Sequence, residues 1–193
     1  MEKYPLYKKS AIYQQVKAYY ELEQYLDAKA LIDQLLVQQP EEADAYLICT
    51  EISLQLSDVI GAVSCAEDGL SKHPEHVDLR FLLGRSYLLA AIIDQGLQEF
   101  NAALKLQPGN HPLRLKIADE LMALQRYQEA LEHYEVVASA QPGSAQATIG
   151  RANSLLKLDR DEEAKAIAIK LSADETTRGD GYYVLGRIAF KQE

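Results

Sequence analysis

Four of the six prolines in this chain recur at a spacing of 34 residues. They are Pro40, Pro74, Pro108 and Pro142, and the spacing holds without any insertion or deletion. If each proline stands at position 32 of a repeat, the repeats span residues 9–42, 43–76, 77–110, 111–144, 145–178 and, incompletely, 179–193. Residues 1–8 then form an N-terminal extension. A period of this length predicts a stack of small structural units that each pack against their neighbours.

Each repeat contains two stretches in which apolar residues recur at helical spacing. In the third repeat, the first stretch carries Leu79, Leu83 and Tyr87, and the second carries Phe100 and Leu104. A short polar turn separates the two stretches, and so short a connection predicts an antiparallel helix hairpin. The proline at position 32 ends the second helix, because proline lacks an amide donor and disfavours helix in the residue before it.

Small residues and capping residues support the same frame. Positions 8 and 20 hold Gly, Ala or Thr in the second to fifth repeats, so we expect the two backbones of a hairpin to approach closely there. Asn110 and Ser144 precede the first helix of the next repeat, where their side chains can accept hydrogen bonds from its free amides. Pro112 suits the first turn of the helix that follows Asn110.

The repeats resemble tetratricopeptide repeats, which favour Leu-Gly at positions 7 and 8, Tyr at 11, Ala at 20, an aromatic residue at 24, Ala at 27 and Pro at 32. The third repeat matches best, with Leu83-Gly84, Tyr87, Phe100, Ala103 and Pro108, and it departs from the pattern at Gly96. The fifth repeat has Thr176 in place of the proline. The resemblance covers residues 9–190. It implies an all-α, right-handed superhelical solenoid of five hairpins plus a sixth first helix, forming one domain over residues 9–193.

In this family the first helix of each repeat, here called the A helix, lines a concave groove with positions 5, 9 and 12. Position 5 holds Tyr13, Leu47, Phe81, Leu115, Ile149 and Tyr183. Position 12 holds Tyr20, Leu54, Leu88, Met122, Leu156 and Phe190. Position 9, between them, holds Lys17, Glu51, Arg85, Asp119, Asn153 and Arg187. The resemblance therefore implies a peptide-binding groove in which two apolar rows flank a row of mixed charge, suited to an amphipathic helix or an extended apolar peptide.

A second interpretation of positions 5 and 12 is that they pack against the next repeat, and the two interpretations are compatible. Some members of the family clamp a C-terminal carboxylate with Lys at position 5 and Asn at position 9. Only Asn153 fits that pattern, and Ile149 stands where the lysine is required. We therefore do not expect a partner that is recognised through its C-terminal carboxylate, as chaperones are.

The acidic balance of the chain narrows the class of partner. A formal charge of −9 and a pI near 5.0 argue against nucleic acid or an anionic membrane, because both attract Lys and Arg. The longest apolar run, residues 87–93, is too short to span a bilayer, and the first residues do not resemble a secretory signal. Cys49 and Cys65 fall at apolar helix positions and are interpreted as buried free thiols in a reducing compartment, which favours the cytoplasm. A disulfide between these two cysteines is the less favoured alternative.

Residues that could carry chemistry are scattered. His73, His76 and His111 lie at turns between repeats, and His133 lies on a second helix with no nucleophile to serve. The acidic run at residues 159–163 lacks the glycine and the ligand spacing of a calcium loop. No glycine-rich phosphate loop is present. We therefore expect no catalytic residue, no cofactor and no metal.

The sequence accordingly predicts a protein-interaction scaffold that binds a partner peptide or helix. Two alternatives remain at this stage. One is the repeat region of a larger enzyme, such as a bacterial sulfotransferase or glycosyltransferase. The other is a self-assembly module, because the final A helix carries Tyr182 and Leu185 without a second helix to cover them.

Overall fold

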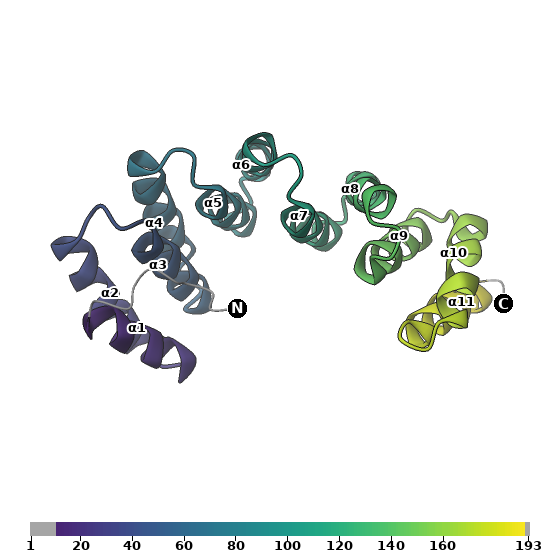
Figure 1. Ribbon diagram of the computed structural model, residues 1–193, viewed down its shortest axis with the longest axis horizontal. Helices are drawn as coiled ribbons and strands as arrows, with labels where there is room; N and C mark the ends of the chain where they lie inside the picture. The colour runs from purple at the N-terminus through teal and green to yellow at the C-terminus, as the bar shows by residue number, and fades with distance from the viewer. Residues whose placement is uncertain (1–10, 192–193) are drawn as a thin grey trace. The chain divides into compact units, whose positions relative to one another are not determined.

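The computed structural model describes residues 11–191, which form helices joined by short turns and contain no strand (Figure 1). The helices are α1 (Ala11–Glu21), α2 (Tyr25–Gln38), α3 (Ala43–Gln55), α4 (Val59–Lys72), α5 (Val77–Leu89), α6 (Ile93–Leu106), α7 (His111–Ala123), α8 (Tyr127–Ala140), α9 (Ala145–Lys157), α10 (Asp161–Ala173) and α11 (Arg178–Lys191). The all-α class is confirmed. The predicted extension, residues 1–8, lies outside the described residues.

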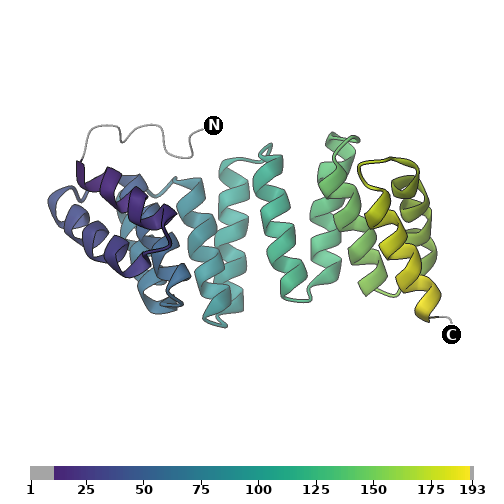
Figure 2. The same ribbon diagram turned by 90° about the horizontal axis from the view of Figure 1, so that it is seen from below.

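The chain divides into two compact bodies, with the boundary between Gln107 and Pro108. The N-terminal body contains α1 to α6 and the C-terminal body contains α7 to α11. Odd-numbered helices are the A helices, and the even-numbered helices are the second, or B, helices. The helices α3, α5, α7 and α9 begin at the first residue of the second, third, fourth and fifth repeats. Within each body, successive helices run antiparallel (Figure 2).

The A helices of each body contact one another directly. In the N-terminal body α3 contacts α5, and in the C-terminal body α9 contacts both α7 and α11. In Figure 1 the helices α7, α9 and α11 lie along one side of the C-terminal body, and α8 and α10 lie along the other. The A helices α3 and α5 in one body, and α7, α9 and α11 in the other, therefore form a continuous face, and the side of each body on which its A helices lie is here called the A-helix face.

The turn inside every complete hairpin places one residue in the left-handed conformation. These residues are Glu23, Ser57, Ala91, Gln125 and Asp159, with φ between 57° and 61°. The amide of the next residue then donates to a carbonyl five residues back, as from Ile92 N to Tyr87 O at 2.8 Å. This pattern satisfies a carbonyl that would otherwise be unpaired at the helix end. No glycine occupies any of the five positions, although a residue with a Cβ is less stable there.

The connections between repeats follow the predicted proline and capping pattern. Asn110 Oδ1 accepts a hydrogen bond from Leu113 N at 3.0 Å, and Ser144 Oγ accepts one from Ala147 N at 3.3 Å. The side chain at position 4 adds a contact that the sequence did not reveal. The Arg80 guanidinium donates to the carbonyl oxygen of Pro74 at 2.7 and 3.1 Å, which ties the loop to the helix that follows it.

Close helix packing in the third repeat depends on two glycines. A Cβ at Gly84 of α5 would lie 2.9 Å from the backbone oxygen of Gly96 on α6, and 2.7 Å from the ring of Phe100. A Cβ at Gly96 would lie 2.8 Å from the oxygen of Gly84. The departure from alanine at position 20 therefore lets α5 and α6 approach more closely than two side chains would permit.

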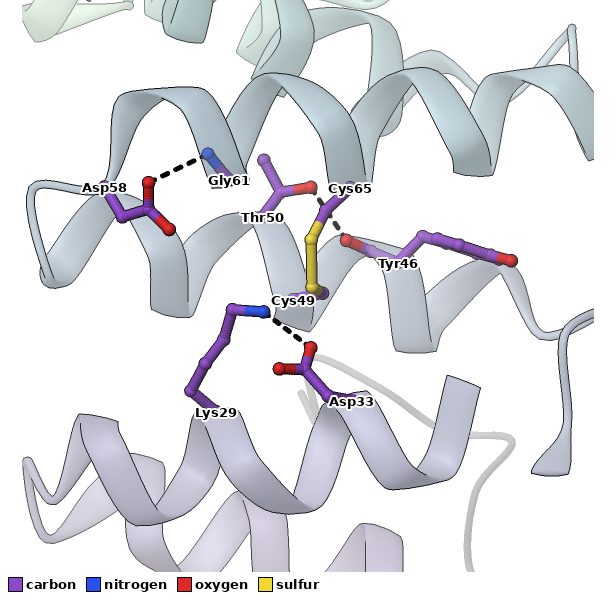
Figure 3. A network of polar contacts seen from close by, with 8 residues as sticks. All are labelled: Lys29, Asp33, Tyr46, Cys49, Thr50, Asp58, Gly61 and Cys65. Carbon is purple, nitrogen blue, oxygen red and sulfur yellow. Dashed lines mark hydrogen bonds and ion pairs between the residues drawn. A yellow bond between two sulfur atoms is a disulfide. The ribbon is translucent and has the colours of Figure 1, made fainter. Parts of the chain in front are cut away.

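The two cysteines are joined, and the expectation of free thiols is wrong. Cys49 of α3 and Cys65 of α4 form a disulfide with their Cα atoms 6.0 Å apart (Figure 3). The hairpin brings positions 7 and 23 of the second repeat face to face, at a Cα separation that is usual for a disulfide. The cysteines consequently give no support to a reducing compartment.

Candidate functional site on the A-helix face

Neighbouring helices bury half of the side chains in the predicted apolar rows. At position 5, Tyr13, Leu47, Phe81 and Leu115 are each less than a tenth exposed, Ile149 is half-buried and Tyr183 is exposed. At position 12, Leu88 and Leu156 are buried, Tyr20, Leu54 and Met122 are half-buried, and Phe190 is exposed. The packing interpretation therefore describes the six buried side chains, and the other six leave part of each row accessible to a ligand.

Position 9 provides the more accessible surface. Arg85, Asp119 and Arg187 are exposed, and Lys17, Glu51 and Asn153 are half-buried. These six residues are called the polar row. Lys17 and Arg187 lie on the first and last described helices, and the other four lie on α3, α5, α7 and α9.

In the N-terminal body, charged side chains of the A helices surround a buried tyrosine. Burial raises the pKa of Tyr13 above its ordinary value, and the nearby carboxylates of Asp44 and Glu51 raise it further. The tyrosine therefore stays protonated between α1 and α3. Lys17 forms an ion pair with Glu21 along α1 at 3.6 Å. These contacts fix the start of the polar row.

In the C-terminal body, the A-helix face contains a pocket of about 350 Å³. Its lining residues come from α7, α8 and α9 and are Asp119, Met122, Tyr134, Gln146, Ile149, Gly150 and Asn153. Asp119 is the single charged residue among them. This pocket is here called the Asp119 pocket. It brings together four of the predicted groove residues, which are Asp119, Met122, Ile149 and Asn153. Lys17, Glu51 and Arg85, in the N-terminal body, line no part of it.

Two hydrogen bonds hold the Asp119 carboxylate in place. The Tyr134 hydroxyl donates to Oδ1, and Gln146 Nε2 donates to Oδ2 at 3.1 Å. Burial raises the pKa of Tyr134, and the hydrogen bond to Asp119 raises it further, so the hydroxyl remains a donor at neutral pH. Ser154 Oγ lies 3.1 Å from the sulfur of Met122, which orients the apolar wall of the pocket.

Nothing in the repeat pattern marks Tyr134, Gln146 and Gly150 as site residues. A Cβ at Gly150 would lie 2.4 to 2.6 Å from three atoms of the Tyr134 ring. The missing Cβ therefore allows the ring, which is 3 % exposed, to lie against α9 and reach Asp119. An indication was present in the sequence, because a buried tyrosine needs a hydrogen-bond partner for its hydroxyl.

A second hollow, of about 500 Å³, lies between α1 and α2 and is lined by Gln15, Ala18, Tyr19, Leu22, Asp27, Ala30 and Leu31. None of the predicted groove residues lines it. Among residues 11–191, no group of three or more His, Cys, Asp or Glu side chains lies close enough to hold a metal ion. No helix in the same range is long and apolar enough to cross a membrane.

Histidine 133, on α8, lies beside a permanent positive charge. Its Nδ1 is 3.2 Å from an Arg114 guanidinium nitrogen. Burial lowers the pKa of His133, and the charge of Arg114 lowers it further. The imidazole is therefore held in its neutral form, as a partner of the arginine that ties α7 to the preceding loop.

Comparisons with known proteins agree with the geometry. Tetratricopeptide repeat models match residues 13–59, 54–111 and 121–188. A tetratricopeptide repeat protein from Parabacteroides merdae has a TM-score of 0.70 at 16 % identity, over 91 % of this chain and 73 % of that one. YrrB, described as having an unusual peptide-binding site, has a TM-score of 0.66 at 18 % identity, over 89 % and 88 %. A protein from Thermus thermophilus has a TM-score of 0.64 at 18 % identity, over 89 % and 96 %. No curated protein sequence matches the chain.

Proposed function

Because this chain belongs to the tetratricopeptide repeat family, we propose that it is an interaction scaffold that binds a peptide or helix of a partner protein on its A-helix face. The observation that carries this proposal is an accessible, chemically mixed surface on the A helices of each body, formed by the polar row in both bodies and by the Asp119 pocket in the C-terminal body. The peptide-binding site described for YrrB supports a polypeptide ligand. The proposed role is binding rather than catalysis.

The physical basis of the proposal is that different positions of the repeat have different roles. Positions 5 and 12 supply packing and some apolar contact area, while position 9 supplies charges that differ from one helix to the next. Varied charge along a binding surface fixes the register of a bound segment and excludes partners with the wrong pattern. The chain charge of −9 favours a polypeptide over nucleic acid as the ligand.

Selection from a library of linear peptides displayed on phage tests this proposal. Recovered peptides are synthesised, and their dissociation constants are measured by fluorescence polarisation with wild-type protein and with two pairs of variants. Arg85→Ala is compared with Lys105→Ala, an exposed residue of α6. Asp119→Asn is compared with Glu132→Gln, an exposed residue of α8.

The proposal expects that variants at Arg85 or Asp119 weaken binding, whereas variants at Lys105 and Glu132 do not. Circular dichroism confirms that each variant is folded. The proposal would be contradicted by a library that yields no binder. It would also be contradicted by peptides whose dissociation constants change only with the B-helix variants.

A second candidate function is self-association through α11. Tyr182, Tyr183 and Phe190 are 60 %, 56 % and 78 % exposed, and no other described element lies within 4 Å of a Cβ built at Gly186. An exposed apolar face of this kind attracts a second helix. Sedimentation equilibrium of wild-type protein and of Phe190→Glu distinguishes the two states. A wild-type chain that remains monomeric as its concentration rises would remove this candidate.

A further inference from the structure

The Asp119 pocket has the charge of a site for a cation. Asp119 is exposed and accepts hydrogen bonds from Tyr134 and Gln146, but it is in no ion pair with any of residues 11–191. A carboxylate has roughly four positions for accepting hydrogen bonds, so about two remain available. No lysine or arginine lines the pocket. An acidic ligand there would meet an uncompensated like charge, which discriminates against it.

The remaining walls suit an aliphatic stem. Met122 and Ile149 are half-buried and provide apolar surface beside the carboxylate. Lysine and arginine side chains combine a flexible apolar stem with a charged end, and they bury the stem while the charge finds an acceptor. Asn153 adds an amide that can accept from a cation or pair with a peptide backbone. A volume of about 350 Å³ is at the lower end for ligand pockets, consistent with one side chain.

The carboxylate is also preorganised. Tyr134 is held in place by its burial and by the missing Cβ of Gly150, and its hydroxyl fixes one oxygen of Asp119. Gln146 fixes the other oxygen. A ligand therefore meets an acceptor whose orientation is already set, which reduces the entropy cost of binding.

We infer that the Asp119 pocket binds a lysine or arginine side chain of the partner segment, with the cation at Asp119 and the aliphatic stem against Met122 and Ile149. This inference rests on the proposed function, because the side chain belongs to the polypeptide bound on the A-helix face. It makes the partner segment basic at the point where it crosses α7 and α9. The charges are the reverse of those in a carboxylate clamp, because here the protein supplies the carboxylate and the ligand supplies the cation.

The chain contains a built-in reporter for this inference. Its only two methionines are Met1 and Met122, so protein labelled with ¹³C at the methionine methyl groups gives few signals, and Met122→Leu assigns them. The probes are the Nα-acetyl, N-methylamide derivatives of lysine, arginine, norleucine and glutamate. Norleucine keeps the lysine stem without the charge.

The lysine and arginine probes, titrated at millimolar concentrations, are expected to shift the Met122 signal and to bind about tenfold more tightly than the norleucine probe. That factor is the weaker end of the range for hydrogen bonds to charged groups. Asp119→Asn should remove this preference, while Glu132→Gln should preserve it. Rising salt should weaken binding of the cationic probes. Comparison of the lysine and arginine probes shows which of the two the pocket prefers.

Equal binding of the norleucine and lysine probes would overturn the inference, and so would a preference that survives Asp119→Asn. These outcomes are separable from failure of the proposed function. If display-selected peptides bind the A-helix face and their affinity does not depend on a basic residue, the scaffold function is supported and the cation site is refuted. If cationic probes shift Met122 but no peptide is ever selected, the cation site stands and the peptide-binding function falls.

Discussion

Gly84 and Gly186 occupy position 8 of their repeats, in the interior of α5 and α11, but their surroundings differ. A Cβ at Gly84 would lie 2.7 Å from the Phe100 ring and 2.9 Å from the backbone oxygen of Gly96. A Cβ at Gly186 would have no described atom within 4 Å apart from those of its own helix backbone and its two chain neighbours. Replacement of each glycine by alanine therefore separates the intrinsic effect on the helix from the cost of close packing.

The intrinsic effect is the same at both positions. Alanine in a helix interior is about 1 kcal/mol more favourable than glycine, so Gly186→Ala should stabilise the protein by about that amount. At Gly84 the same gain is opposed by overpacking, which costs about 1–3 kcal/mol. One obstructing atom belongs to the backbone of α6, so a whole helix must shift and the cost falls at the upper end. The net effect of Gly84→Ala is then a loss of about 2 kcal/mol.

The assay is urea unfolding monitored by circular dichroism. Midpoints are compared only between variants whose free energy of unfolding depends equally steeply on urea concentration. Thermal unfolding is the second measurement. For a chain of this size, 1 kcal/mol corresponds to about 2–4 °C, so Gly186→Ala should raise the melting temperature by about 3 °C and Gly84→Ala should lower it by about 6 °C. The reasoning is refuted if Gly84→Ala stabilises the protein as much as Gly186→Ala does, or if both substitutions destabilise it equally.

Three further predictions concern other parts of the fold. Ala91→Gly should stabilise the protein by about 1 kcal/mol because it relieves a left-handed residue, whereas Ala90→Gly, at a negative φ, should destabilise it; urea midpoints give both signs. Reduction of the Cys49–Cys65 disulfide, which joins residues 16 apart, should lower the free energy of unfolding by about 3 kcal/mol, measured as a lower urea midpoint in the presence of reductant. A double Cys→Ser variant should show the same midpoint with and without reductant. An unchanged midpoint of the wild-type protein in reductant would contradict the disulfide. The pKa of His133 is lower in the folded chain, so the unfolded chain binds the proton first as the pH falls below about 6.5, and the free energy of unfolding should decrease. His133→Gln should remove that part of the decrease between about pH 7 and about pH 5. If the free energy of unfolding of His133→Gln depends on pH as steeply as that of the wild type, the prediction is refuted.

The fold could be predicted because local residues mark the boundaries of four of the repeats. The prolines at position 32 and the caps at Asn110 and Ser144 act locally, through backbone amides that need partners. Their effect does not depend on the rest of the chain. The left-handed residue in each hairpin turn could not be predicted in the same way, because Ala91 and Glu23 carry no preference for that conformation. Packing of the two helices imposes it.

The candidate site was harder to predict, because accessibility depends on helix-to-helix distance rather than on residue type. Phe81 fits the pattern of a groove residue, yet it is 9 % exposed, and its ring stacks on Phe100 with centroids 5.5 Å apart. A polar substitution of Phe81 would therefore perturb the core and not the groove. The Asp119 pocket depends on the missing Cβ of Gly150, whose effect is on a tyrosine of another helix. Such a relation appears only when the two helices are placed side by side.

The central claim, that the A-helix face binds a polypeptide, is tested most directly by site-specific photo-crosslinking. The photoreactive residue p-benzoylphenylalanine replaces, one at a time, Leu89, Ala123 or Lys157, which are exposed residues of the A helices α5, α7 and α9, and Lys105 or Glu132 on B helices. Each protein is irradiated with the tightest-binding peptide from the phage selection. The account predicts crosslinks from the A-helix positions and none from positions 105 and 132. Crosslinks that come mainly from the B-helix positions would contradict it.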